Sequence, residues 1–209
     1  MVIKERRKQE KDEMRRKILS VAKGIAAKDG WQNLTIRKIC SEIRYSAPVV
    51  YEYFEGKGQI LQAIRTEGIG EMHELFLEVD HNYCQPEKRL LEYGLAWRYF
   101  AKRNAELYQV MYNLQGAVCN MGDHQPNTAI LDHYHQAFSA INRKAQASEK
   151  YRWELCDNFI AIIHGFISLR MVNKIRSGIS NEDQVFTDAI QRFIHIINDS
   201  NTDLCQKEN

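Results

Sequence analysis

The sequence contains little proline, few cysteines and no long hydrophobic run. Among 209 residues there are three prolines and five cysteines. The cysteines are odd in number and form no CxxC pair, which excludes a disulfide scaffold and favours reduced thiols. The longest charge-free apolar stretch, residues 158–169, is shorter than the roughly 20 residues that a bilayer requires. With 44% hydrophobic residues, the chain is predicted to be globular rather than collagenous, disordered or membrane-spanning.

Motifs for export, catalysis and cofactor binding are also missing. The N-terminus turns to charge directly after Ile3, so no signal-peptide core is present and we expect a cytoplasmic protein with no membrane partner. No nucleophile stands at motif spacing from a base, and there is no glycine-rich phosphate loop. We therefore expect neither an enzyme nor a cofactor.

A cluster of metal-binding residue types raises one alternative. Cys119, His124, His133 and His135 lie close together in the sequence. His133 and His135 are two residues apart, so on a helix they point about 200° away from each other and cannot both bind one ion. We expect no metal site, and a metal sensor remains the weaker alternative.

Charge is distributed unevenly along the chain. Residues 1–57 carry 14 basic and 8 acidic residues, whereas residues 58–209 carry 15 basic and 19 acidic residues. A small basic module joined to a larger acidic one favours a polyanionic partner for the first module. The alternative is that the basic run at residues 4–17 is only a solvated helix surface.

The hydrophobic pattern predicts an all-α fold of about nine helices, because no strand-like alternation persists over a useful length. Residues 1–57 are predicted to form a three-helix helix-turn-helix domain. Residues 58–199 are predicted to form a helical bundle for ligand binding and dimerisation, and residues 200–209 a frayed tail. The expected helices cover residues 5–29, 36–43, 47–54, 59–79, 87–102, 105–114, 128–147, 149–176 and 182–198.

Local signals divide the first domain into its helices. Gly30 supplies a left-handed stop for the first helix. Thr35 is a good N-cap with a hydrophobic staple around it, and Ser46 is a second N-cap, followed by Pro48 in a first helical turn. Two short helices joined by only three residues, 44–46, indicate a helix-turn-helix.

The second helix of this motif has a small, weakly charged leading face that suits entry into a DNA major groove. Hydroxyl and basic side chains around it suit phosphate oxygens. The alternative is that Tyr51 and Tyr53 merely fill the core. The candidate DNA-binding residues are Thr35, Arg37, Lys38, Ser46, Ala47, Pro48, Val49, Tyr51, Tyr53 and Lys57.

This window resembles the DNA-binding domain of TetR-family transcriptional regulators. The resemblance implies that the helix after Ser46 reads the major groove and that Tyr51, Tyr53 and Lys57 touch phosphates. In the turn, the family's Ala-Gly-Val is replaced by residues 43–45, so Arg44 must adopt a left-handed conformation, at a cost of about 1 kcal/mol, or the turn must differ in shape. The matching pieces are the long first helix ending at Gly30, the Thr35-Ile36-Arg37 opening, Ile39, Ser46, Tyr51-x-x-Phe54 and Lys57.

The second domain resembles TetR-family C-terminal domains more loosely, through residues 97–101, residues 106–111 and the His164-Gly165 pair. The resemblance implies a small-molecule domain whose last two helices form a four-helix bundle with a second subunit. Both helices are apolar on two sides, which independently favours a homodimer. The alternative is central helices buried within a monomer. The candidate dimerisation residues are Trp153, Ile160, Ile163, Ile167, Phe186, Ile190, Phe193 and Ile197.

The effector site is predicted less sharply, because methionine and aromatic residues also fill ordinary helical cores. Their abundance suits a hydrophobic or planar ligand, whose identity stays unknown. The candidate ligand-binding residues are Met72, Tyr93, Trp97, Tyr108, Met111, Met121, Tyr134 and Phe138.

Together these features predict a homodimeric repressor that binds a palindromic operator and is released by a small hydrophobic effector. One alternative is an activator or architectural DNA-binding protein whose bundle only dimerises or recruits a protein partner. Another is a helical interaction protein whose basic module contacts acidic protein.

Overall fold

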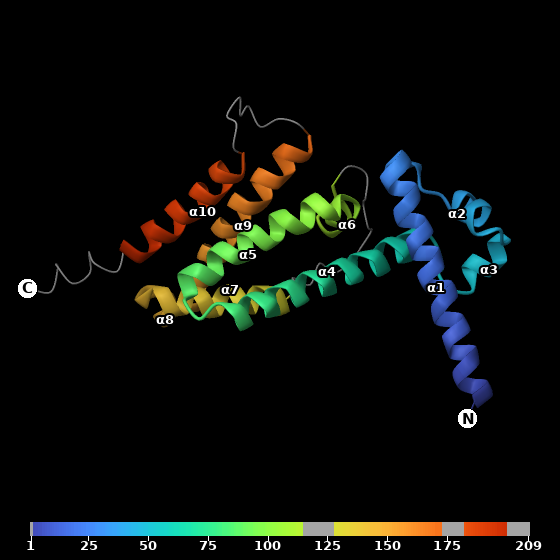
Figure 1. The fold of residues 1–209 in the computed structure, drawn as a ribbon, viewed down its shortest axis with the longest axis horizontal. Helices are drawn as coiled ribbons and strands as arrows, with labels where there is room; N and C mark the ends of the chain where they lie inside the picture. The colour runs from blue at the N-terminus through green and yellow to red at the C-terminus, as the bar shows by residue number, and fades with distance from the viewer. Residues whose placement is uncertain (1, 115–127, 173–181, 200–209) are drawn as a thin grey trace, which may run out of the picture. The chain divides into compact units, whose positions relative to one another are not determined.

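The computed structural model describes residues 2–114, 128–172 and 182–199. The described residues contain helices and no strand, so the predicted all-α class is confirmed (Figure 1). The elements are α1 (Val2–Asp29), the 3-10 helix η1 (Trp31–Asn33), α2 (Ile36–Ile43), α3 (Ala47–Tyr51), α4 (Lys57–Asn82), α5 (Pro86–Arg103), α6 (Ala105–Met111), α7 (Thr128–Ile141), α8 (Arg143–Ala147), α9 (Glu149–Met171) and α10 (Glu182–Asp199).

Several helix ends differ from the sequence predictions. Helix α3 stops at Tyr51 rather than at residue 54, and α4 begins at Lys57 rather than at residue 59. Helix α9 ends at Met171, before the predicted end at residue 176. Helix ends depend on capping and on tertiary contacts, which hydrophobic periodicity does not report.

The chain divides into two compact units. The first comprises residues 1–70 and 103–124, and the second comprises residues 71–102 and 125–209. Helix α4 therefore begins in the first unit and ends in the second, while α6 belongs to the first unit. Within the described ranges, no helix is both long and apolar enough to cross a bilayer.

In the first unit, α1 packs against α2 and η1, and α3 packs against α2 (Figure 1). The Trp31 indole donates a hydrogen bond of 3.2 Å to the Glu106 carbonyl oxygen, which ties η1 to α6. The buried apolar side chains include Ile18, Ala22, Trp31, Ile39, Val50, Phe54, Ile60 and Ile64.

The predicted capping signals have different outcomes. Thr35 caps α2, because its hydroxyl accepts a 3.2 Å hydrogen bond from the Lys38 amide, and the flanking Leu34 and Ile39 are buried as a staple requires. Ser46 occupies the N-cap position of α3, but its side chain accepts no capping hydrogen bond. Gly30 has the expected positive φ of 82°, although its ψ of 155° lies outside the left-handed helical region.

The turn between α2 and α3 contains a left-handed residue although it has no glycine. Arg44 has φ 61° and ψ 42°, which is the left-handed conformation, and its amide donates to the Cys40 carbonyl oxygen. Of the two possibilities for this turn, the strained one is therefore present. Arg44 therefore carries the conformational cost of about 1 kcal/mol that glycine would avoid.

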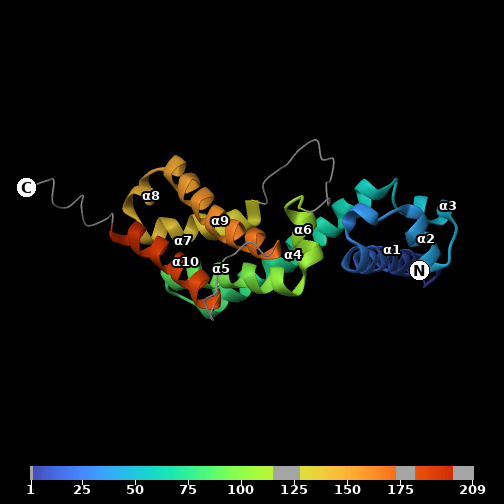
Figure 2. The same cartoon turned by 90° about the horizontal axis from the view of Figure 1, so that it is seen from above.

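In the second unit, α9 packs against α7, α8 and α10 (Figure 2). Gly94 of α5 lies directly against Ile190 of α10, and a β-carbon at this position would overlap the isoleucine side chain. The absence of a side chain at Gly94 thus permits close approach of α5 and α10.

The predicted helix at residues 128–147 is interrupted at Asn142. This buried side chain caps α8 by accepting a 2.9 Å hydrogen bond from the Ala145 amide, and it donates a 2.8 Å bond to the Ile197 carbonyl oxygen. Asparagine is a favourable N-cap, so the break had a sequence signal, but the contact with α10 is tertiary.

Candidate nucleic-acid interface

Helix α3 is anchored by one face and free on the other. Val50 and Phe54 are buried, whereas the Tyr51 side chain is 53% exposed. The residues at the start of the helix, from Ser46 to Pro48, are exposed, and Val49 is half-buried. Because the exposed residues at the start of the helix, from Ser46 to Pro48, are small and uncharged, this end of α3 can approach base edges closely without burying a charged side chain.

All ten candidate DNA-binding residues belong to the first unit, on or beside α2, α3 and the start of α4, and each retains exposed surface. The exposure of Tyr51 argues against the alternative in which it only fills the core. Tyr53 is half-buried. Contact with DNA by these residues remains a prediction.

Lys38 is exposed and forms an ion pair with Asp29, with 2.8 Å between its Nζ and the carboxylate. The hydrogen bond from Lys38 holds the pKa of Asp29 below its usual value. An exposed pair of this kind is worth little, so Lys38 can exchange Asp29 for a phosphate at small cost.

Lys57 is engaged more firmly. Its ammonium donates a 2.7 Å hydrogen bond to the Trp31 carbonyl oxygen, and partial burial lowers its pKa. An ammonium has three donors, so Lys57 can hold η1 and still offer a hydrogen bond to a phosphate. Its role is therefore partly structural, which the sequence did not indicate.

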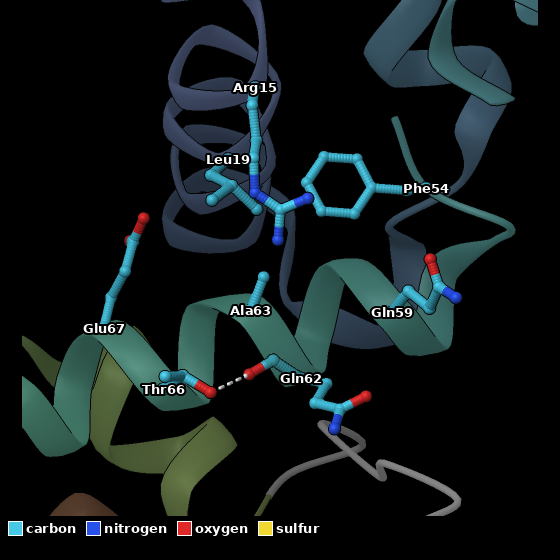
Figure 3. A pocket seen from close by; sticks show the side chains of 8 residues that line it. All are labelled: Arg15, Leu19, Phe54, Gln59, Gln62, Ala63, Thr66 and Glu67. Atoms are coloured by element: carbon cyan, nitrogen blue, oxygen red, sulfur yellow. Dashed lines mark hydrogen bonds between the residues drawn. The ribbon is translucent and has the colours of Figure 1, made fainter. Parts of the chain in front are cut away.

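Arg15 of α1 was missed by the sequence analysis. Its guanidinium lies 4.4 Å from the centre of the Phe54 ring, and its Nη1 is 3.4 Å from the Tyr53 carbonyl oxygen. Figure 3 shows this stacking at one side of a groove of about 470 Å³ between α1 and α4. Arg15 thus links α1 to the segment just after α3.

Tyr45, in the turn before α3, was also missed. Its side chain is 45% exposed, and the Lys17 ammonium lies 5.5 Å from its ring centre. A large exposed aromatic beside an outward-facing helix is a contact residue in many interfaces. The departure from the family turn at residues 43–45 was the available signal.

The described candidate effector residues are divided between the two units. Tyr108 and Met111 are buried in the first unit, and Met121 lies outside the described residues. The others form an aromatic core in the second unit, where Phe76 stacks on Tyr93 with 4.4 Å between ring centres. The buried members in this unit are Met72, Tyr93, Trp97, Tyr134 and Phe138.

Polar groups are embedded in this aromatic core. Trp97 donates a hydrogen bond to the Tyr134 hydroxyl. The His164 ring meets Trp97 edge-on at 5.0 Å between centres, and burial lowers the pKa of His164 to about 3. His164 is therefore neutral at physiological pH.

A charged cluster surrounds Asp80 of α4. The Tyr93 hydroxyl donates to one Asp80 oxygen, His133 Nδ1 lies 2.6 Å from the other, and Arg89 pairs with the carboxylate at 3.3 Å. Burial alone would raise the pKa of Asp80, but these hydrogen bonds together lower it. Burial and the bond to Asp80 raise the pKa of Tyr93. No sequence motif indicated this cluster.

The two neighbouring histidines diverge as their spacing predicts. His133 faces Asp80, whereas the His135 ring lies 4.2 Å from that of Trp153, and burial lowers the pKa of His135. Cys119 and His124 lie outside the described residues. Within the part that is described, no three metal-ligating side chains come together.

The candidate dimerisation residues fall into two groups. Five of them, Ile163, Ile167, Phe186, Ile190 and Ile197, are buried within the protomer and form its own core. Trp153, Ile160 and Phe193 are half-buried. Exposed apolar side chains on α9 and α10 were not among the predicted residues: Leu169, Val185 and Ile196.

Comparison with known proteins supports this architecture. The family model "Bacterial regulatory proteins, tetR family" matches residues 18–64, and "Tetracyclin repressor-like, C-terminal domain" matches residues 90–193. Together the two matches cover well over half of the chain. No curated protein sequence matches it closely.

Solved structures share the fold at low sequence identity. A TetR variant from Acinetobacter baumannii AYE in complex with minocycline is 14% identical, with a TM-score of 0.65, over 88% of this chain and 96% of that one. A TetR/AcrR-family transcriptional regulator from Thermobifida fusca YX-ER1 is 18% identical, with a TM-score of 0.57, over 87% and 96%.

The two family matches follow the chain in the order that the fold requires, with the helix-turn-helix first and the helical bundle second. They point to a regulatory protein rather than an enzyme. The chain belongs to the TetR family of bacterial transcriptional regulators, with an N-terminal DNA-binding domain.

Proposed function

We propose that the protein is a ligand-responsive repressor that binds a palindromic operator as a homodimer and leaves it when a small hydrophobic effector binds. The observation that carries the proposal is that α3 has one buried face and one exposed face. Val50 and Phe54 fix this helix in the core, while Tyr51 and the residues from Ser46 to Val49 keep exposed surface. An anchored helix with a free leading face suits major-groove reading.

The geometry of DNA supports the proposed homodimer. Two recognition helices can contact one duplex together only when they lie about 34–36 Å apart, or a multiple of the helical repeat. Exposed apolar residues on α9 and α10, such as Leu169 and Ile196, supply surface for pairing. A palindromic site mirrors the two-fold symmetry of such a pair.

The effector is proposed to bind in the second unit, at the aromatic core around Phe76, Trp97 and Tyr134. This core combines aromatic rings with a few hydrogen-bonding groups, a composition typical of small-molecule sites. The complex of the structurally similar TetR variant with minocycline supports a planar ligand. A difference of about 1–3 kcal/mol in effector affinity between the DNA-bound and released states suffices for regulation.

Selection of genomic DNA fragments by the purified protein tests the DNA-binding part. We expect enrichment of fragments sharing an inverted repeat, protection of both half-sites in footprinting, and two protomers per duplex. Enrichment without any common sequence would contradict specific binding. A reporter driven by the selected fragment then distinguishes a repressor from an activator.

An activator or architectural protein whose bundle only dimerises or recruits a protein partner is the second candidate. A thermal-shift screen with a library of hydrophobic and planar compounds separates the two. We expect at least one compound to raise the melting temperature and to weaken DNA binding. Compounds that stabilise the protein but leave DNA affinity unchanged would favour the second candidate.

A further inference from the structure

One face of α1 changes from basic to apolar along the helix. Five basic residues recur at helical spacing over its first four turns: Lys4, Arg7, Lys8, Lys11 and Arg15. At about 100° per residue they lie within one arc of the helix surface. The same arc continues into the buried side chains of Ile18, Ala22 and Ile25. We call the five basic residues the α1 stripe.

The acidic residues of this segment lie elsewhere. Glu5, Glu10, Asp12 and Glu13 fall outside the arc of the α1 stripe at helical spacing. On the other face, Arg6 pairs with Glu10 at 2.9 Å. A solvated helix surface mixes both signs on each face, so this segregation needs another explanation.

The α1 stripe extends beyond the packed part of the first unit. Residues 4–13 are exposed, Met14 is the first half-buried residue, and Ile18 is the first buried one. The segment from Val2 to residue 13 corresponds to about 18 Å of helix at 1.5 Å per residue. Lys4, Arg7, Lys8 and Lys11 form no ion pair or hydrogen bond within the part of the chain that is described.

The α1 stripe ends beside the candidate DNA-binding surface. Its last member, Arg15, stacks on Phe54 (Figure 3). The Nη1 atom of Arg15 also approaches the Tyr53 carbonyl oxygen. Tyr53 and Phe54 lie two and three residues after the end of α3 at Tyr51. The stripe therefore reaches the segment that carries Tyr53, one of the predicted phosphate contacts.

We propose that the α1 stripe binds the phosphate backbone of the DNA that flanks the site read by α3. This inference rests on the proposed DNA-binding function and adds a second contact surface to it. The partner is assigned by charge complementarity: unpaired lysine and arginine side chains on one face suit a regular row of phosphates. An overhang of about 18 Å corresponds to about 5 base pairs at 3.4 Å per step.

Such contacts have a distinct signature. Neutralised phosphates release counterions, so the logarithm of the binding constant falls with the logarithm of salt concentration by about 0.9 per contact. Contacts outside the recognised half-sites also require DNA to be present there. The stripe should therefore affect salt dependence and flank dependence together, without changing sequence preference.

The test uses the full-length protein and two duplexes that carry the selected site. One is trimmed to the footprinted half-sites, and the other is extended by about 10 base pairs on each side. The stripe variant is Arg7→Gln with Lys11→Gln, and the matched control is Arg6→Gln with Arg16→Gln on the opposite face. Each double substitution removes two positive charges per protomer. Glutamine has a helix propensity similar to that of lysine and arginine, and circular dichroism verifies that the helix content is unchanged.

Fluorescence anisotropy titrations over a range of salt concentrations give the readout. On the extended duplex, we expect the stripe variant to bind about tenfold or more weakly than wild type near 0.15 M salt. Its salt slope should be lower by about 3–4, since two contacts are lost in each protomer of a dimer. On the trimmed duplex, the stripe variant and wild type should agree within about twofold.

The inference would be overturned if both variants weakened DNA binding equally, or if the stripe variant lost as much affinity on the trimmed duplex as on the extended one. Either result would leave the proposed function intact. If wild type does not distinguish the selected site from a scrambled one, the proposed function fails instead. In that case, the salt slopes of wild type and the stripe variant on long scrambled DNA still measure phosphate contact by the stripe. Equal slopes for the two proteins would refute that contact.

Discussion

Some side chains of the first unit stabilise its fold, and others are exposed and available to contact DNA. Tyr51 belongs to the second group, because its ring is half-exposed and it lies one position from the buried Val50. Lys57 belongs to both, because its ammonium already holds the Trp31 carbonyl oxygen. Substitutions at these two positions should therefore have different effects on stability.

Replacing Tyr51 by phenylalanine tests the free group. The substitution should change the free energy of unfolding by less than about 0.5 kcal/mol, since an exposed hydroxyl is lost. It should weaken operator binding by about 2 kcal/mol, or roughly 30-fold, because one phosphate hydrogen bond is lost in each protomer of the dimer. Urea unfolding and anisotropy titrations measure the two quantities. Unchanged operator affinity would argue against phosphate contact by Tyr51.

The Asp80 carboxylate gives a prediction for the second unit. Its pKa is lower in the folded protein than its ordinary value, so its stabilising effect is present above about pH 4 and is lost as the pH falls through the folded-state pKa. Asp80→Asn should lower the free energy of unfolding by about 1–2 kcal/mol at neutral pH. This difference should become smaller as the pH falls below about 4. Urea unfolding at several pH values measures it, and a constant difference would contradict the lowered pKa.

Helix α2 and helix α3 begin with different kinds of N-cap. Thr35 accepts a hydrogen bond from the Lys38 amide, whereas the Ser46 side chain accepts no capping hydrogen bond. Thr35→Ala should therefore lower the free energy of unfolding by about 1 kcal/mol. Ser46→Ala serves as the matched control and should change it by less than about 0.5 kcal/mol. Equal losses in thermal or urea unfolding would show that both residues cap their helices.

The helices of the first unit could be predicted because their signals are local. A cap at Thr35, a proline at position 48 and a glycine at position 30 each act within one or two turns of chain, and the structure places a helix end near each. The conformation of Arg44 was limited in advance to two possibilities by comparison with the turn of the TetR family. Family resemblance then added roles that composition alone did not provide.

Tertiary contacts set the features that the sequence did not predict. The break at Asn142 is reinforced by a hydrogen bond to α10, and the Asp80 cluster joins side chains from three helices. The close approach at Gly94 likewise requires Ile190, which lies far along the chain. Hydrophobic periodicity identified the core residues of α9 and α10 but did not distinguish a protomer core from a subunit interface.

For the whole molecule, the central structural expectation is a dimer. The protomer mass is 24.5 kDa, and analytical ultracentrifugation should give twice this value. The side chains of Leu169 and Ile196 are 50% and 67% exposed, and replacing both with glutamate should shift the protein to monomers. Leu77→Glu, at a side chain 44% exposed on α4, should leave the dimer intact. A wild-type monomer at micromolar concentration would contradict the expectation.

The most direct test of DNA recognition by the exposed face of α3 compares two duplexes of equal length, one carrying the selected inverted repeat and one with the same bases scrambled. Anisotropy titrations at about 0.15 M salt measure both dissociation constants. We predict that the inverted repeat binds at least about 10³-fold more tightly, as expected for specific recognition. Equal affinities for the two duplexes would contradict it.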